Sequence, residues 1–128
     1  VDQLIKEMRD RDIEINSSKV LIMGLSFKEN CPDIRNSKVL DIIEELLSLD
    51  VIVDVHDPWV NKSEAERSFG LVLKNYLIKG AYDAVLLTVA HEEYKNMQPD
   101  ELRALLKKEG ILYDIKSIFP KSSSDLRL

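Results

Sequence analysis

The chain contains four short runs of mostly apolar residues, in which apolar positions follow one another almost without interruption instead of alternating with polar ones. The runs are Lys19–Leu25, Val51–His56, Tyr82–Val89 and Ile111–Ile115. Continuous apolar runs of this length are typical of parallel strands that helices cover on both faces of a sheet. The pattern therefore predicts four buried parallel strands.

Between these runs the apolar spacing changes to that of amphipathic helices. Helices are predicted over Val1–Ile15, Ser37–Asp50, Asn61–Ser68 and Pro99–Glu109. Asn36 or Ser37 can cap the second of these, and Gly110 is expected to end the last. The segment Leu71–Ile78 fits a short strand or a loop followed by a helix, and its pattern does not decide between them.

Strands that alternate with helices predict an α/β fold with a doubly wound, mostly parallel, Rossmann-like sheet in three layers (α/β/α). The length of 128 residues suits a single domain of this kind, preceded by a helix. In such sheets ligands bind beyond the carboxyl ends of the strands. The segments that should contain a site are Ser26–Ser37, Asp57–Trp59, Ala90–Tyr94 and Lys116–Phe119.

Composition excludes several classes of partner. The net charge is −5 and the basic residues are dispersed, which argues against nucleic acid. The longest apolar run, Ala84–Ala90, is far shorter than the roughly 20 residues that span a bilayer, and no signal-peptide pattern is present, so we expect no membrane contact and a cytoplasmic location. Cys31, His56 and His91 do not stand at metal-ligand spacing, and no metal site is expected.

The segment Gly24–Ser37 carries the most specific chemistry in the chain. It lacks the three glycines of a dinucleotide fingerprint and the Gly-Lys-Ser/Thr of a phosphate loop. Lys28 and Arg35 nevertheless stand between a buried strand and the beginning of a helix, where two cations can bind an anionic group. Alternatively, they pair on the surface with Glu29 and Asp33, and their spacing alone leaves both interpretations open.

The same segment resembles the signature of the C-terminal domain of the UDP-glucose/GDP-mannose dehydrogenase family, Gly-x-Ser/Ala-Phe-Lys-x-Asn/Asp-x-x-Asp-x-Arg-x-Ser. The matching residues are Gly24, Ser26, Phe27, Lys28, Asn30, Asp33, Arg35 and Ser37. Further matches are Asp57-Pro58, Asp83-Ala84 and, as in the branch that acts on UDP-N-acetylhexosamines, Ala90-His91 and Asp114-x-Lys116. The chain departs from the family at His56, where Tyr is common, and at Ser117, where Gly is common.

The resemblance implies an NAD-dependent nucleotide-sugar 6-dehydrogenase, which oxidises the C6 alcohol twice to give a uronate used in polysaccharide synthesis. In the family a Cys nucleophile of the central domain carries the chemistry, and NAD is bound mainly by the N-terminal domain. Cys31 is not that nucleophile, so we assign no catalytic residue here and expect the fragment alone to be inactive. Residues 1–18 would be the end of the inter-domain helix that forms the family's homodimer, and residues 19–128 the domain that binds the nucleotide sugar.

By the same resemblance, Phe27 and Lys28 would contact the UDP-sugar, a UDP-N-acetylhexosamine in this branch, and Arg35 would contact NAD across the domain cleft. Phe27 could instead anchor the loop in the core. Asp33 is expected to order the loop and Ser37 to cap the following helix.

The sequence alone does not determine the roles of three further residues. His91 fits a structural hydrogen-bonding role better than a catalytic one. Lys116 could meet a phosphate or be solvated, and Trp59 could stack on a base or pack under the loop.

Two other classes of function share the α/β pattern. A signalling receiver domain would need an acidic pair after the first strand, where this chain has Gly24-Leu25-Ser26. A binding module that holds a nucleotide sugar without chemistry would be a fair description of the isolated fragment, since every proposed catalytic group lies outside it.

Overall fold

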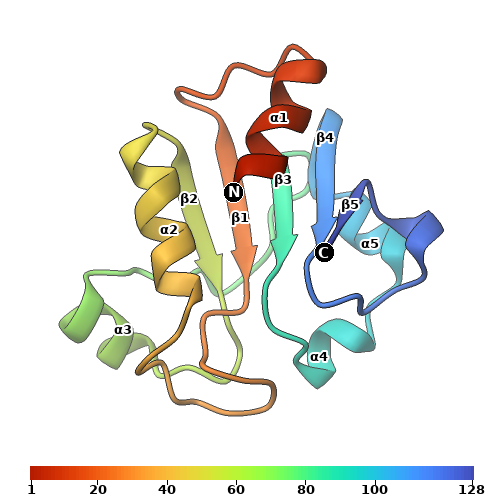
Figure 1. Ribbon diagram of the computed structural model, residues 1–128. Helices are drawn as coiled ribbons and strands as arrows, with labels where there is room; N and C mark the ends of the chain where they lie inside the picture. The colour runs from red at the N-terminus through yellow and green to blue at the C-terminus, as the bar shows by residue number, and fades with distance from the viewer.

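The computed structural model describes residues 1–128 and contains one parallel sheet of five strands in the order β2-β1-β3-β4-β5 (Figure 1). The strands are β1 (Lys19–Met23), β2 (Ile52–His56), β3 (Tyr82–Leu87), β4 (Leu106–Asp114) and β5 (Leu126–Arg127). In the centre of the sheet, Val20 pairs with Val53 on one side and with Ala84 on the other. The predicted doubly wound parallel sheet is confirmed. The additional strand β5 was not predicted, because it has only two residues and leaves no pattern in the sequence.

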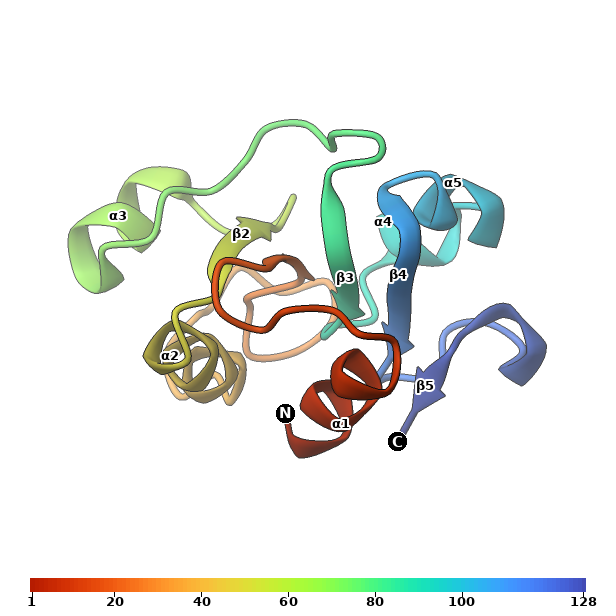
Figure 2. The same cartoon turned by 90° about the horizontal axis from the view of Figure 1, so that it is seen from above.

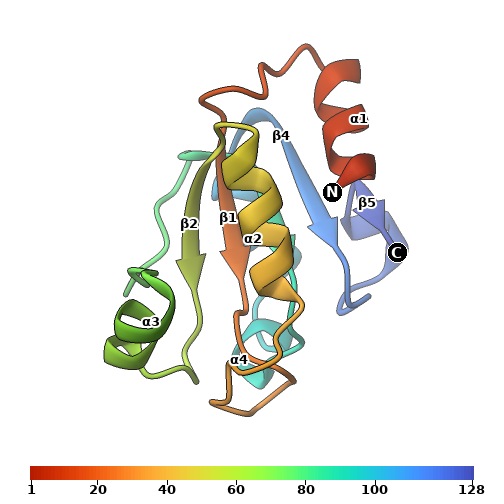
Figure 3. The same cartoon turned by 60° about the vertical axis from the view of Figure 1, so that its left-hand side comes forward.

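Helices cover both faces of this sheet. They are α1 (Asp2–Asp10), α2 (Val39–Ser48), α3 (Lys62–Phe69), α4 (Glu92–Lys95) and α5 (Pro99–Arg103), followed by a 3₁₀ turn at Lys121–Ser123. Figure 2 shows α1 and α2 on one side of the sheet and α4 and α5 on the other. In Figure 3, α2 lies across β1, while α1 lies near β4 and β5. The predicted three layers are therefore present.

The sheet has two cores because successive side chains of a strand point to opposite faces. In β1, Val20 and Ile22 are buried with α1 and α2, whereas Leu21 and Met23 are buried with α4 and α5. Full burial of each such side chain contributes about 1.5–3 kcal/mol. Both faces of the central strands are buried, which explains why the corresponding runs in the sequence are continuously apolar.

The apolar face of α1 packs against the sheet of its own chain. Leu4 and Met8 are fully buried in the same core as α2. The guanidinium of Arg11 donates to the Gly110 carbonyl at 3.0 Å and pairs with Asp125 at 3.2 Å. The helix ends earlier than predicted because Asp12 adopts a left-handed φ of 57°.

The prediction of a helix over Pro99–Glu109 is wrong beyond Arg103. Leu106 pairs with Tyr82 at the beginning of β4, and the next pair joins Ala84 to Ile111, so the intervening residues bulge out of the sheet. Burial of Leu106 and pairing with β3 override the helical preference of the charged residues that follow it. Gly110 ends no helix. It closes the bulge, where a Cβ would lie 2.8 Å from the Cβ of Leu106.

Two other segments complete the edges of the fold. The ambiguous stretch Leu71–Ile78 forms neither a regular strand nor a helix, and only Leu73 makes a single parallel bridge to Val55 at the free edge of β2. The short helix α4 was not predicted, since one turn has too few positions to show a helical period.

Gly24 closes the end of β1 at a position that no other residue fits well. Its φ is +113°, and a Cβ there would lie 2.6 Å from the Cβ of Val89. We expect Gly24→Ala to lower the free energy of unfolding by about 2–4 kcal/mol through backbone strain and overpacking. Gly70→Ala is the matched control, because Gly70 has a φ of +68° but open space around it. This substitution should lower the free energy of unfolding by only about 1 kcal/mol. Urea unfolding measures both, and equal losses would contradict the steric argument.

Candidate functional site

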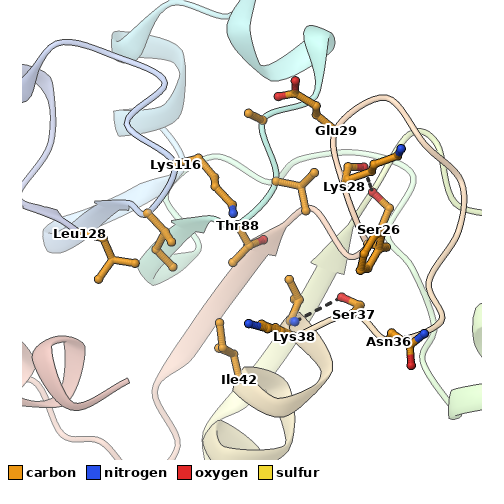
Figure 4. Close-up of a pocket in the computed structure, with 15 residues that line it drawn as sticks. Ser26, Lys28, Glu29, Asn36, Ser37, Lys38, Ile42, Thr88, Lys116 and Leu128 are labelled. Carbon is orange, nitrogen blue, oxygen red and sulfur yellow. Dashed lines mark hydrogen bonds between the residues drawn. The ribbon is translucent and has the colours of Figure 1, made fainter.

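A pocket of about 650 Å³ opens at the carboxyl ends of β1, β3 and β4, where it meets the beginning of α2 (Figure 4). Three lysines line it, namely Lys28, Lys38 and Lys116, against a single acidic residue, Glu29. Figure 4 shows Lys28 on the side of the loop after β1, Lys116 on the opposite side and Lys38 between them. The lining is therefore positively charged and suits an anionic ligand.

The amino terminus of α2 adds to this positive potential. The Ser37 hydroxyl accepts the Val39 N–H at 3.2 Å and donates to the Leu25 carbonyl at 2.7 Å. Ser37 thus satisfies a first-turn N–H as predicted, although it precedes the N-cap position, which Lys38 occupies. Because the helix dipole is positive at this end, α2 reinforces the charge of the lysines in the pocket.

Phe27 and Lys28 both line the pocket. The Phe27 side chain does not anchor the loop in the core, because the residue is 56% exposed. Lys28 does not pair with Glu29, which instead lies 3.7 Å from the ammonium of Lys95. An exposed ring and a cation without an ion-pair partner thus stand together at the rim of the pocket.

Arg35 lies outside the lining of the pocket. Its guanidinium pairs with Asp33 at 3.1 Å, and its side chain is 80% exposed. The surface-pair interpretation is therefore correct for Arg35 and wrong for Lys28. Asp33 also accepts the backbone N–H of Arg35 at 2.9 Å, and hydrogen bonding to Arg35 lowers the pKa of the Asp33 carboxyl. The expected role of Asp33 in ordering the loop is confirmed.

Asp57 joins the loop after β1 to the loop after β2. Its buried carboxylate accepts the N–H groups of Leu25 at 2.7 Å and Ser26 at 3.0 Å on one oxygen, and those of Trp59 at 2.8 Å and Val60 at 3.2 Å on the other. Burial alone would raise the pKa of Asp57, but the hydrogen bonds that it accepts outweigh burial and hold the pKa below its usual value. From the sequence, Asp57 stood out only as part of the Asp57-Pro58 match in a segment expected near the site, and nothing there indicated that it joins two loops.

His91 joins the loop after β3 to the other two loops and is fully buried. Its Nδ1 accepts the Asn30 N–H at 2.9 Å, and its Nε2 lies 2.9 Å from an Asp57 oxygen and 3.1 Å from the Ser26 hydroxyl. Since Nδ1 is an acceptor, the hydrogen-bond network assigns the ring as neutral with its proton on Nε2. The predicted structural role of His91 is confirmed by these contacts.

Ser26, His91 and Asp57 have the composition of a catalytic triad without its geometry. In a working triad the serine and the carboxylate meet different ring nitrogens. Here both meet Nε2, which carries the ring proton, and Nδ1 accepts the Asn30 N–H, so neither ring nitrogen is free to take the proton of the Ser26 hydroxyl. Trp59 stacks on the buried ring with a centroid distance of 6.2 Å, and its indole N–H donates to Glu93 at 2.9 Å, so it packs beside the loops.

Asp114 directs the chain after β4 so that Lys116 reaches the pocket. Its buried carboxylate accepts the N–H groups of Ile118 and Phe119, both at 2.9 Å. The Asp-x-Lys motif therefore combines a residue that shapes the turn with a cation at the site. On the floor of the pocket, the Thr88 hydroxyl contacts the Met23 and Gly24 carbonyl oxygens at 2.9 and 2.6 Å.

Other kinds of site receive no support. No three His, Cys, Asp or Glu side chains gather in a way that could hold a metal ion. Cys31 is a free, partly buried thiol in the loop. None of the helices is both long enough and apolar enough to span a bilayer.

His56, next to the site, makes the stability of the domain dependent on pH. Burial lowers the pKa of His56, and its Nδ1 lies 2.8 Å from the Tyr94 hydroxyl. The unfolded chain then binds more protons than the folded chain below about pH 6.5, so the free energy of unfolding should fall as the pH drops through that range. The lowered pKa of Asp57 adds a separate loss of stability at more acidic pH, below about 4.

We expect His56→Asn to make the free energy of unfolding less dependent on pH between pH 7 and 5, and to leave the loss at more acidic pH unchanged. Urea unfolding at each pH measures this dependence. If the free energy of unfolding of the variant falls between pH 7 and 5 as steeply as that of the wild type, His56 is not its cause.

The fold and the pocket define a class of protein: a doubly wound α/β domain with a cationic site at the carboxyl edge of its sheet. Sequence comparison specifies the family. Residues 21–121 match the model of the UDP-glucose/GDP-mannose dehydrogenase family, UDP binding domain, and the chain belongs to this family. The receiver interpretation is thereby disfavoured.

Relatives agree with this assignment, and a solved structure shares the fold. The chain is 48% identical over 128 residues to UDP-N-acetyl-D-glucosamine 6-dehydrogenase of Pseudomonas aeruginosa and 40% identical over 127 residues to the Salmonella typhi enzyme of the same name. These alignments cover 100% and 99% of the chain, but only 30% of each relative. Among solved structures, NDP-N-acetyl-D-galactosaminuronic acid dehydrogenase of Methanosarcina mazei Go1 shares the fold, with a TM-score of 0.82 at 19% identity over 95% of this chain and 25% of that one.

Proposed function

We propose that this domain binds the UDP-sugar substrate of an NAD-dependent nucleotide-sugar 6-dehydrogenase, and that the substrate is a UDP-N-acetylhexosamine. The observation that carries the proposal is the pocket at the carboxyl edge of the sheet, with its three lysines and the amino terminus of α2. The substrate class is supported by the two relatives at 48% and 40% identity, both UDP-N-acetyl-D-glucosamine 6-dehydrogenases. The reaction would supply uronates for polysaccharide synthesis.

In this proposal the diphosphate lies among Lys28, Lys38 and Lys116. An ammonium offers a compact charge with three N–H donors, and the first-turn N–H groups of α2 offer further donors to the same oxygens. Phe27, exposed beside Lys28, supplies an apolar face for the sugar or the base. The pocket of about 650 Å³ is within the size range of sites that enclose a ligand of this kind.

We propose that the oxidation itself takes place on other domains of the enzyme. This chain has no glycine-rich turn after β1 to hold a dinucleotide, and no step of hydride transfer is assigned to its residues. Arg35, exposed on the loop, would reach NAD bound by a neighbouring domain, where its planar guanidinium suits a pair of phosphate oxygens. Residues 1–18 would be the end of the inter-domain helix of a homodimeric, cytoplasmic enzyme.

Isothermal titration with UDP tests the binding proposal. We expect saturable UDP binding to the chain, much weaker binding of uridine, and a loss of about tenfold or more in UDP affinity for Lys28→Ala, since a charge-assisted hydrogen bond contributes about 1.5–3 kcal/mol. Lys121→Ala is the matched control, because Lys121 is exposed and lies outside the pocket. Equal affinity for UDP and uridine, or equal effects of the two alanine variants, would contradict the proposal.

A further inference from the structure

The segment 28–32 of the ligand-binding loop has no backbone-to-backbone hydrogen bonds of its own. Phe27, just before it, is tied to the loop by its N–H, which donates to the Asp33 carbonyl at 2.6 Å. Within the segment, the Lys28 carbonyl accepts the Ser26 hydroxyl at 3.0 Å, and the only backbone N–H with a partner is that of Asn30, which donates to His91. The conformation of this segment therefore depends on side chains from elsewhere in the fold.

Asn30 is the point at which the loop is fastened. Its N–H donates to Nδ1 of His91 at 2.9 Å, and its side-chain oxygen accepts the Glu92 N–H at 2.9 Å. Asn30 has a left-handed φ of 54°, which asparagine tolerates better than most residues. Two consecutive residues after β3 thus hold both the backbone and the side chain of one loop residue.

His91 can act as a fixed anchor because every side of its ring is occupied. It is fully buried, its Nε2 donates toward the Asp57 carboxylate at 2.9 Å, and Trp59 and Tyr94 pack against it with centroid distances of 6.2 and 5.6 Å. Asp57 is itself held by four backbone N–H groups. The ring is therefore fixed in orientation and in tautomer, and Nδ1 can only accept.

We propose that His91 is the positioning residue of the ligand-binding loop: by accepting the Asn30 N–H, it sets the conformation that places Phe27 and Lys28 at the pocket. His91 does not itself line the pocket, so it acts through the loop rather than on the ligand. The inference rests on the proposed function only for the identity of that ligand. Its structural part, that Nδ1 of His91 fixes the loop, is testable without any ligand.

Two substitutions separate the two nitrogens of the ring. His91→Asn places an amide oxygen near the position of Nδ1 and keeps an acceptor for Asn30, whereas His91→Gln places an amide nitrogen near the position of Nε2 and keeps a donor for Asp57. We expect backbone amide exchange of Phe27 and Asn30 to be about tenfold faster or more in His91→Gln, and within roughly threefold of the wild type in His91→Asn. UDP affinity should follow the same order.

Tyr82→Phe controls for a general loss of stability. It removes a buried hydrogen bond of 2.8 Å to Asp54 in the sheet and touches none of the three loops. It should therefore lower stability without a selective increase of exchange at Phe27 and Asn30. The inference is overturned if His91→Asn and His91→Gln change exchange equally, or if neither exceeds Tyr82→Phe at matched stability. If the wild type does not bind UDP at all, the proposed function fails while the exchange data still decide the role of His91.

Discussion

Simultaneous replacement of Lys38 and Lys116 by alanine is expected to abolish measurable UDP binding to the domain. Both side chains line the pocket, and with Lys28 they provide all of its side-chain cations. Each charge-assisted contact contributes about 1.5–3 kcal/mol, so the loss of two predicts a fall in affinity of about 10²- to 10⁴-fold. Isothermal titration at low ionic strength measures it.

The double substitution Lys108→Ala/Lys121→Ala is the control for this experiment. It removes the same net charge from exposed positions outside the pocket. A general electrostatic attraction would be weakened equally by both doubles and would disappear at high salt. Equal losses would show that UDP is attracted without being bound at this site.

Asp57→Ala is expected to have the largest effect on folding. Its carboxylate joins the loops after β1, β2 and β3 by accepting four backbone N–H groups and the His91 ring. Its removal leaves several buried donors without partners, and we expect the free energy of unfolding to fall by about 3–5 kcal/mol. Asp57→Asn keeps one acceptor oxygen and should cost less.

Asp33→Ala provides the comparison for Asp57, since Asp33 also accepts several N–H groups, all of them from Arg35, but is partly exposed in the loop after β1. Water can replace its contacts, so its loss should cost no more than about 1 kcal/mol. Urea unfolding of the three variants gives the order directly. If Asp57→Ala is no worse than Asp33→Ala, Asp57 does not hold the loops together.

The strands were predictable from sequence because burial on both faces leaves a direct trace in composition. Val20–Met23 and Ala84–Leu87 are apolar at every position, and all eight residues are buried. The boundary between α5 and β4 was not predictable, since the apolar residues Leu102, Leu105 and Leu106 fit a helical period as well as a strand. Pairing with Tyr82 decides between them, and this contact is 24 residues away in the chain.

The part of the site that lies in one segment was predictable from the sequence. The part that is formed by residues from several segments was not. Phe27 and Lys28 stand in a contiguous motif and both line the pocket. Asp57 and His91 are 34 residues apart, and only the fold brings their side chains together. Lys38 was not predicted as a site residue, because it stands at the beginning of a helix, where a lysine ordinarily faces solvent.

In the proposed complex, a UDP diphosphate is held between the loop after β1, the amino terminus of α2 and the end of β4. A crystal structure of the chain with UDP tests it most directly. We predict phosphate oxygens within hydrogen-bonding distance of the Lys28 and Lys116 ammonium groups, with the α2 amino terminus facing the same oxygens. Ordered UDP elsewhere on the domain, with this pocket filled only by solvent, would contradict the claim.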